Sequence, residues 1–195
     1  MYAYDLGSAP LAAAREGDAV RKAQRIGMRG TDYFNAGVML IDLARWRSMR
    51  LTARVLEAWR THGASFPLLE QDALNCALDG NFAVFTQHHV RLMDAFAPWD
   101  VDFSAQDTIW HFLNEGKPWI NYADPRVHER YWRVVHASPW SNLAPSEPWE
   151  TRIAYLAGCH AEAAEDYRAA AHYFHAAAER LMQFYLEQTS ISPSE

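Results

Sequence analysis

The apolar run at residues 33–41, YFNAGVMLI, constrains the fold of this chain more than any other segment. It is nearly continuous, as expected for a β-strand that is covered on both faces. Asp42 follows as the N-cap of a helix predicted at 43–62, which Gly63 ends. The apolar residues of this helix recur at helical spacing and are Leu43, Trp46, Val55, Leu56 and Trp59. A strand that leads directly into an amphipathic helix indicates an α/β fold.

Further strands and helices alternate along the chain up to about residue 145. The segment 11–15 is either a short buried strand or the start of a helix, because its pattern fits both. The other predicted elements are a helix at 68–78 between Pro67 and Asp79, strands at 81–85 and 108–113, an irregular stretch at 87–107 and a helix at 125–135. This alternation supports the α/β class.

The composition changes after this α/β part. Residues 136–149 contain Pro139, Pro145 and Pro148 together with Ser and Asn, which is typical of a linker. Two Ala-rich helices are predicted beyond the linker, at 150–164 and 167–187. We therefore predict a domain at 1–145, an α-helical hairpin at 146–188 and a tail at 189–195.

The predicted hairpin resembles a single tetratricopeptide unit, in which small residues lie where two helices cross and aromatic residues where they pack. The matching residues are Gly158, Tyr167, Ala170, Tyr173, Phe174 and Ala177, while Glu165 stands where such units usually have Gly. A plain amphipathic hairpin fits the pattern equally well. Because one unit cannot bury its own face, it must pack on the α/β domain, on a partner or on a second copy of the chain. Self-association is therefore one expected outcome.

Composition and charge exclude several classes of function. The 195 residues have a formal net charge of -6, and this acidity argues against nucleic acid as a partner. Residues 147–195 hold three basic against eight acidic side chains, which argues against binding to anionic lipid. No segment has the ~20 apolar residues of a membrane helix, and the start does not resemble a signal peptide. The two cysteines, Cys76 and Cys159, have no metal-binding spacing and do not indicate a disulfide framework. The absence of such a framework favours a reducing, cytoplasmic location.

Three segments carry polar groups that are suited to chemistry. They contain Asn35 and Gly37 in the apolar strand, then Glu70, Gln71 and Asp72 at a helix start, and finally His111, Asn114 and Lys117 around a strand end. Each also has a structural explanation: a strand Gly can mark a bulge or a close approach, acidic residues complement a helix N-terminus, and a lone His is more often structural. An imidazole can also ligate a divalent metal, and a Lys can neutralise a phosphate.

Taken in order, the three segments resemble glycosyltransferase family 8. The blocks are YFNAGVMLIDLARWR at 33–47, EQDALN at 70–75 and HFLNEGKPW at 111–119, and the similarity covers about residues 3–120. That family has the GT-A fold and includes lipopolysaccharide galactosyl- and glucosyltransferases and glycogenins. The resemblance therefore implies a partial GT-A (nucleotide-diphospho-sugar transferase) fold, followed here by the helical hairpin.

The resemblance implies roles for the first two blocks. Asn35 matches the Asn that contacts the donor or acceptor sugar. Gln71 matches the residue beside the anomeric carbon that is discussed as a nucleophile or stabiliser, and Asp72 matches its neighbour, so both are candidate catalytic residues. Glu70 replaces the usual first Asp of the block and is expected to bind sugar hydroxyls.

The third block implies a metal and a phosphate contact. His111 matches a Mn²⁺ ligand, and Lys117 matches the Lys that contacts the diphosphate. The family usually has Gly where this chain has Asn114, so a side chain stands where the loop backbone approaches the diphosphate. Mn²⁺ or Mg²⁺ prefers oxygen ligands, and a single His does not hold either ion.

The other metal ligands of the family lie in an Asp-x-Asp motif a short distance before a segment that resembles YDLG at 4–7. This motif is not found upstream of that segment, so the chain is expected to be N-terminally truncated and inactive alone, with metal binding only when the motif is supplied. The pair Asp100 and Asp102 falls instead between the second and third blocks, where an acceptor-side loop is expected.

The sequence therefore predicts a retaining glycosyltransferase that moves galactose or glucose from a UDP-sugar to a saccharide acceptor, in cell-envelope or lipopolysaccharide synthesis. One alternative is a truncated, non-catalytic relic that acts as a binding module. Another is a repeat-protein adaptor, which rests on the hairpin alone. Coding DNA upstream of Met1 with an in-frame Asp-x-Asp segment would favour the enzyme.

Overall fold

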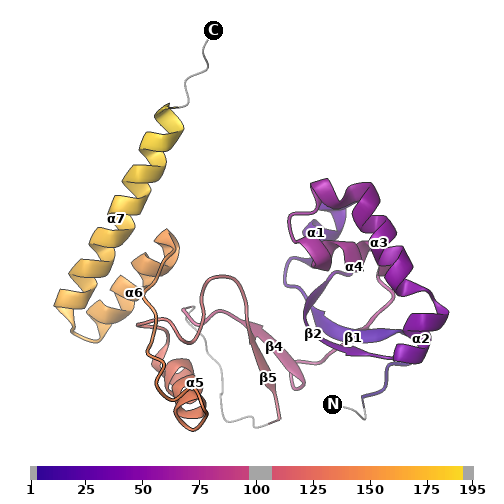
Figure 1. Ribbon diagram of the computed structural model, residues 1–195, viewed down its shortest axis with the longest axis horizontal. Coiled ribbons are helices and arrows are strands. Elements are labelled where there is room, and N and C mark those ends of the chain that lie inside the picture. Colours follow the sequence, from indigo (N-terminus) through magenta and orange to yellow (C-terminus); the bar gives the residue numbers. More distant parts are fainter. Residues whose placement is uncertain (1–3, 97–106, 191–195) are drawn as a thin grey trace. The chain divides into compact units, whose positions relative to one another are not determined.

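The computed structural model describes residues 4–96 and 107–190, and Figure 1 shows their helices and strands. The described residues divide into two compact units. The first contains residues 4–92 and 107–111, and the second contains residues 93–96 and 112–190. Each unit is considered by itself below.

The first unit is built on a three-stranded sheet. Its strands are β1 (Leu11–Arg15), β2 (Phe34–Ile41) and β3 (Ala83–Val84), in the spatial order β2-β1-β3. Strand β1 runs antiparallel to β2 and parallel to β3, and its register with β2 shifts between Ala13 and Ala14. The segment for which the sequence allowed a strand or a helix is therefore a strand. Its first four residues are buried, which explains the continuous apolar pattern.

The expectation that both faces of β2 are covered is wrong for most of the strand. Phe34 and Asn35 are buried, Gly37 is exposed and the remaining residues are half-buried. In the described part of the chain β2 is also an edge strand, since it pairs on one side only, with β1. Its other side is contacted near its start by helix α4, as described below.

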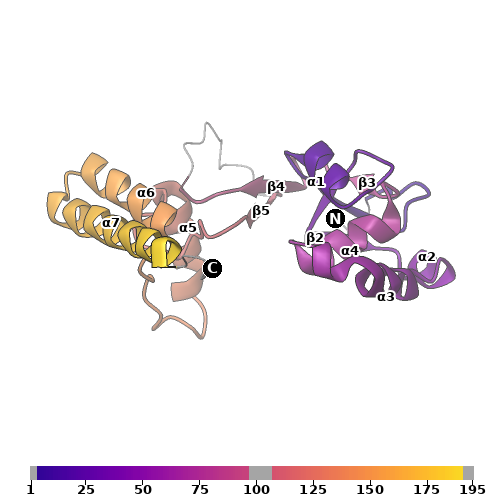
Figure 2. The same ribbon diagram turned by 90° about the horizontal axis from the view of Figure 1, so that it is seen from above.

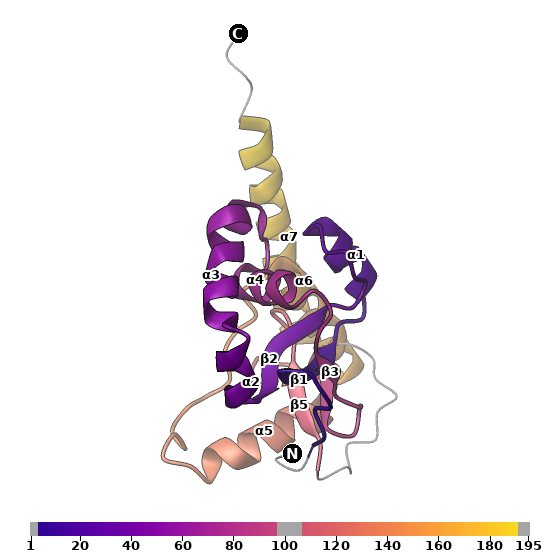
Figure 3. The same ribbon diagram turned by 90° about the vertical axis from the view of Figure 1, so that its right-hand side faces the viewer.

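Four helices connect the strands of this unit. Helix α1 (Ala19–Arg25) lies between β1 and β2, and α2 (Leu43–Ser48), α3 (Leu51–His62) and α4 (Leu69–Leu78) lie between β2 and β3, with a short 3₁₀ turn, η1 (Gly63–Ser65), between α3 and α4. Figure 3 shows α2, α3 and α4 on one side of β1 and β2. The core between them is formed by Leu11, Ala13, Phe34, Leu51, Leu74 and Leu78. Through Leu74 and Leu78 this packing holds α4 next to β2.

The prediction of a single helix at 43–62 is wrong, because the segment is divided at Met49 and Arg50 into α2 and α3. Arg50 has φ +51, a left-handed conformation that a continuous helix cannot contain. The turn buries Leu51 completely. The predicted N-cap is confirmed, since the Asp42 carboxylate accepts a hydrogen bond from the backbone N–H of Arg45 at 2.9 Å.

A second sheet consists of β4 (Val90–Met93) and β5 (Ile109–Phe112). Strand β4 lies in the stretch that the sequence pattern marked as irregular, so that expectation is wrong here. A strand of four residues has too few positions for a period of two to be recognised. The carboxylate pair Asp100 and Asp102 lies outside the described residues.

The second unit is helical. Its helices are α5 (Pro125–His136), α6 (Thr151–Ala163) and α7 (Tyr167–Ser190), and α6 and α7 lie side by side in Figures 1 and 2. A Cβ built on Gly158 would lie 2.7 Å from the ring of Phe174, so this Gly allows the two helices to cross closely. The predicted hairpin is confirmed, whereas the tetratricopeptide interpretation and the boundary near residue 145 stay predictions.

The end of α7 carries exposed apolar side chains. They are Leu181, Met182, Phe184, Tyr185 and Leu186, each more than half exposed. No helix in the described ranges combines the length and the apolar character needed to cross a bilayer.

Candidate active site

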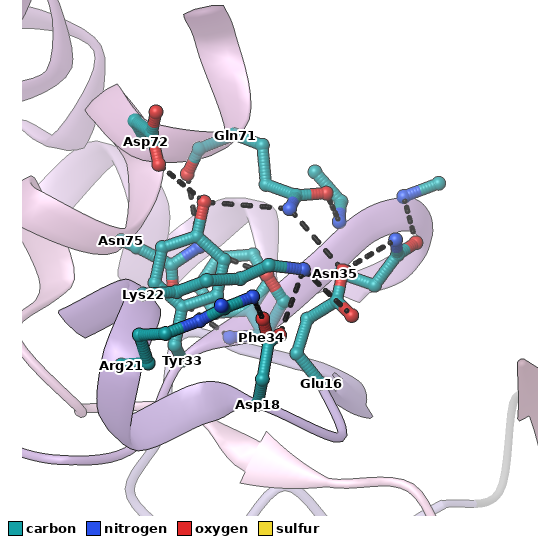
Figure 4. A network of polar contacts seen from close by, with 12 residues as sticks. Glu16, Asp18, Arg21, Lys22, Tyr33, Phe34, Asn35, Gln71, Asp72 and Asn75 are labelled. Carbon is teal, nitrogen blue, oxygen red and sulfur yellow. Dashed lines mark hydrogen bonds and ion pairs between the residues drawn. The ribbon is translucent and has the colours of Figure 1, made fainter. Parts of the chain in front are cut away.

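Helix α4 is fixed against the start of β2 by the side-chain amide of Asn75. The Oδ1 of Asn75 accepts a hydrogen bond from the backbone N–H of Phe34 at 2.8 Å, and its Nδ2 donates to the carbonyl oxygens of Phe34 and Gln71, both at 2.9 Å. Asn75 is 1% exposed. It thus pairs with the β2 backbone as a neighbouring strand would, and it satisfies a buried donor and acceptor. This contact brings the first turn of α4 beside β2 (Figure 4).

The side-chain amide of Gln71 has one orientation that satisfies its contacts. Its Oε1 accepts from the backbone N–H of Ala36 at 2.9 Å, and its Nε2 donates to Glu16 Oε1 at 3.4 Å and to the Tyr33 hydroxyl at 3.3 Å. A backbone N–H only donates and a carboxylate only accepts. A flipped amide would therefore place its NH₂ against the N–H of Ala36 and its oxygen against the carboxylate of Glu16. Gln71 is half-buried within the network drawn in Figure 4.

Asp72 is fully buried at the same turn of α4. Its carboxylate accepts hydrogen bonds from the Tyr33 hydroxyl at 2.5 Å, from the backbone N–H of Leu68 at 2.7 Å and from the Arg25 guanidinium at 3.4 Å. The bond from Leu68 satisfies a backbone donor at the helix N-terminus, where a negative charge is also favourable. Burial, together with the Asp72 carboxylate, raises the pKa of Tyr33, so its hydroxyl remains a donor at neutral pH.

Glu16 belongs to this network, although the sequence patterns did not single it out. Its carboxylate is 9% exposed, accepts from Asn35 Nδ2 at 3.0 Å and pairs with Lys22 Nζ at 3.0 Å. The Oδ1 of Asn35 in turn accepts from the backbone N–H of Gly37 at 2.9 Å. One feature of the sequence could have identified Glu16 as a site residue. It is a carboxylate directly after the buried strand β1, and polar site residues are common in the loops that follow strands.

An imidazole lies against the backbone of β2 at Gly37. A Cβ built on Gly37 would lie 2.1 Å from His111 Nε2 and 2.9 Å from Asn35 Oδ1. The sequence allowed a bulge or a close approach at this Gly, and the pairing with β1 skips from Met39 to Asn35, so Gly37 lies in an irregularity of the ladder. The group that approaches it is a side chain of β5. The structure brings Asn35, Gln71 and His111 to neighbouring positions along β2.

The remaining predicted residues are not members of this hydrogen-bond network. Glu70 is exposed in the first turn of α4. Asn114 and Lys117 belong to the second unit, where Lys117 Nζ donates to the carbonyl oxygen of Phe112 at 2.6 Å. Asn114 is exposed and has φ +52, so it keeps the left-handed backbone that Gly adopts readily and Asn tolerates.

A metal ion does not fit the described part of this site. Within residues 4–96 and 107–190, no group of three or more His, Cys, Asp or Glu side chains could hold one. His111 offers one imidazole nitrogen, and Mn²⁺ or Mg²⁺ prefers several oxygen ligands. The role of His111 as a metal ligand therefore stays a prediction that requires ligands from outside the described residues.

Comparison with known proteins assigns the chain to a family. A family model described as glycosyl transferase family 8 matches residues 2–123. The chain belongs to this family. Its relatives include glycosyltransferase GlyA of Streptococcus pneumoniae, 27% identical over 73% of this chain and 20% of the relative. The lipopolysaccharide glucosyltransferase WaaO of Escherichia coli is 28% identical over 66% of this chain and 40% of WaaO.

Solved structures of the galactosyltransferase LgtC share the fold of this chain. The galactosyltransferase LgtC, crystallised with donor and acceptor sugar analogs, superimposes with a TM-score of 0.56 and 24% identity, over 71% of this chain and 55% of LgtC. The partial GT-A fold that the resemblance implied is therefore confirmed. The family 8 chain described here spans between a fifth and about half of the length of these relatives.

Proposed function

We propose that this chain carries the acceptor-side half of a retaining hexosyltransferase. The enzyme would move galactose or glucose from a UDP-sugar to a saccharide acceptor in the synthesis of lipopolysaccharide or a related cell-envelope glycan, on the cytoplasmic side. The observation that carries this proposal is the approach of Asn35, Gln71 and His111, from three separate sequence blocks, to one stretch of β2.

The proposed chemistry centres on Gln71. Breaking the bond between sugar C1 and UDP leaves an oxocarbenium-like sugar, whose positive charge needs a partner on its β face. The amide of Gln71 is held rigidly by Ala36, Tyr33 and Glu16, and a dipole held in this way needs no reorganisation as the charge develops. An amide is a poor nucleophile, so the acceptor hydroxyl is proposed to attack from the face that UDP leaves.

The neighbouring residues take supporting roles in this proposal. Because Asp72 is fully buried and bonded to Tyr33 and Leu68, it acts as a positioning residue for Gln71 and does not touch the sugar. Asn35 and the exposed Glu70 bind sugar hydroxyls. Their amide and carboxylate groups accept the hydrogen bonds that hydroxyl groups donate.

The leaving group requires positive charge. Lys117 is proposed to neutralise the negative charge that develops on the UDP diphosphate, as a point charge on a flexible stem. In the structure its ammonium is held by the carbonyl oxygen of Phe112. No step is assigned to a metal ion, because the described residues contribute only His111 to a possible site.

The substrate class is supported by the relatives. WaaO is named a lipopolysaccharide glucosyltransferase, and LgtC is a galactosyltransferase whose structure holds donor and acceptor sugar analogs. The half-buried amide of Gln71, the half-buried imidazole of His111 and the exposed carboxylate of Glu70 suit hydroxyl-rich ligands.

A direct test uses the protein as its own host makes it. A C-terminal affinity tag on the gene recovers the polypeptide with whatever precedes residue 1, and UDP release is then measured with UDP-galactose and UDP-glucose. We expect Gln71→Ala to lower kcat by at least about 100-fold, as for the loss of a preorganised transition-state contact. Gln183→Ala, on the exposed face of α7, is the matched control and should leave the rate unchanged.

The same experiment separates the alternative function. If the tagged protein releases no UDP from either donor but binds saccharides, the transferase proposal fails and a non-catalytic binding module is supported. Equal rates for the Gln71 and Gln183 variants would remove Gln71 from the mechanism.

A further inference from the structure

The second unit contains a cleft of about 680 Å³ that the proposed transfer reaction does not use. It lies between the loop before α5, the first turn of α5 and the C-terminal end of α6. Its walls include Asn121, Tyr122, Asp124, His128, Glu129 and His160. Most of these residues follow residue 123, where the match to the family model ends.

Two imidazoles of the cleft are held in the same way. His128 Nδ1 lies 3.0 Å from the carbonyl oxygen of Pro118, and His160 Nδ1 lies 2.8 Å from that of Tyr122. A carbonyl oxygen only accepts, so each Nδ1 carries the proton and each Nε2 of the neutral ring is an acceptor. Among the described residues, neither Nε2 has a hydrogen-bond partner. The cleft thus offers two fixed acceptors.

The carboxylates of the cleft are acceptors too, whereas the donors of Asn121 and Tyr122 are already bonded to Glu147 and Asp166. The Asp124 carboxylate is paired with Arg126 at 2.6 Å, and Glu129 is an exposed carboxylate. The described residues that line the cleft include no Lys or Arg, so a phosphate or another anion lacks a counter-charge. The ligand that fits is rich in hydrogen-bond donors and carries no negative charge.

The remaining surface of the cleft is apolar. Ala123, Pro125, Ala163 and Ala164 contribute to its lining. Such a surface suits the C–H face of a pyranose ring, while the hydroxyl groups at the ring edge meet the acceptors. A transition-metal ion fits less well, because the described residues bring no third His, Cys, Asp or Glu into a ligand group there.

We propose that this cleft is a second saccharide-binding site, in which hydroxyl groups donate to Nε2 of His128 and of His160. It shares no residue with the Gln71 network and does not depend on the transfer reaction. A failure of this proposal would therefore leave the proposed transferase untouched, and the converse also holds.

The test follows the imidazole signals of the 195-residue chain by NMR during titration with lactose. We expect the signals of His128 and His160 to shift with a Kd in the millimolar range, which corresponds to about -4 kcal/mol. His128→Asn and His160→Asn are the informative variants, because the Asn Nδ2 can still donate to the backbone carbonyl while the Nε2 acceptor is lost. Each should weaken lactose binding about fivefold to tenfold.

Matched controls separate binding from folding. His172→Asn, on the exposed face of α7, should keep the affinity of the unmodified chain. Ala163→Phe fills the cleft from an exposed position and should abolish binding, whereas Ala178→Phe on α7 should not. Far-UV circular dichroism confirms that each variant is folded.

Three outcomes would overturn the proposal. The first is the absence of any shift at His128 and His160 with lactose at about 100 mM, a hundredfold above a millimolar Kd. The second is unchanged binding in both Asn variants. The third is a response of the two signals to Zn²⁺ alone and not to lactose, which would make the cleft a metal site.

Discussion

The imidazole of His111 occupies the space that a side chain at Gly37 would fill. A Cβ on Gly37 would come within 2.1 Å of His111 Nε2 and 2.3 Å of its Cε1, which is far inside van der Waals contact. The Gly of the first sequence block is therefore required by the His of the third block. This steric coupling joins two motifs that are far apart in the chain, and it holds whatever ligand the site takes.

Gly37→Ala tests this coupling. The added methyl group must displace the imidazole or the strand, and overpacking of this kind costs about 1–3 kcal/mol. We expect a lower free energy of unfolding in urea and a shifted NMR signal for His111. Gly17→Ala is the control, because no heavy atom lies within 4 Å of its added Cβ. Equal stability of the two variants would show that His111 does not rest on Gly37.

Tyr33→Phe removes the hydroxyl that bridges Asp72 and Gln71. The buried carboxylate then loses its shortest hydrogen bond, and a polar group left less satisfied costs about 1–3 kcal/mol. We also expect the side-chain NH₂ signals of Gln71 to move and to exchange faster with water. Tyr4→Phe loses a hydrogen bond to the carbonyl oxygen of Val84 near the surface and should cost less. Unmoved Gln71 signals would contradict the positioning role.

Asp124→Asn tests the pH dependence of the second unit. The Arg126 guanidinium holds the pKa of Asp124 below its ordinary value, so the carboxylate stabilises the folded state when it is ionised. This contribution is complete above the unfolded pKa of about 3.9 and is lost as the pH falls through the lower folded value. The stability difference between the chain and the variant should be about 0.5–1 kcal/mol at pH 7.

The measurement is urea unfolding of the chain and of Asp124→Asn from pH 7 down to pH 2. The difference in stability between them should shrink as the pH falls below about 4. There the Asp124 carboxyl group becomes protonated, first in the unfolded state and then in the folded state. In an Arg126→Gln background the same substitution should change stability less, because the counter-charge is gone. A difference that grows as the pH falls would reverse the sign and reject the explanation.

UDP binding tests the metal interpretation. Because the described residues supply a single imidazole, we expect isothermal titration of the 195-residue chain with UDP to show weak binding or none. Addition of Mn²⁺ should change this little, and His111→Ala should not weaken it further. A micromolar Kd that requires Mn²⁺ would show that the chain holds the ion with ligands beyond the described residues.

Local pattern was sufficient for much of the fold. The strand at 33–41, the Asp42 cap, the helix at 69–78 closed by Asp79 and the C-terminal hairpin all follow from side-chain properties that act between near neighbours in sequence. The division between α2 and α3 did not follow. It depends on the left-handed backbone of Arg50 and on burial of Leu51, which packs in one core with Leu11 of β1 and Phe34 of β2.

The sequence by itself determined the family, through three blocks whose residue types and order are specific, and it identified Asn35, Gln71 and His111 as site candidates. Only the tertiary structure revealed Glu16, the hydroxyl of Tyr33 and the burial of Asp72. The physical reason is that a hydrogen bond depends on distance and direction in space. The carboxylate of Glu16 after β1 and the amide of Gln71 on α4 share no pattern in the sequence. They come within hydrogen-bond distance only when β1, β2 and α4 pack together.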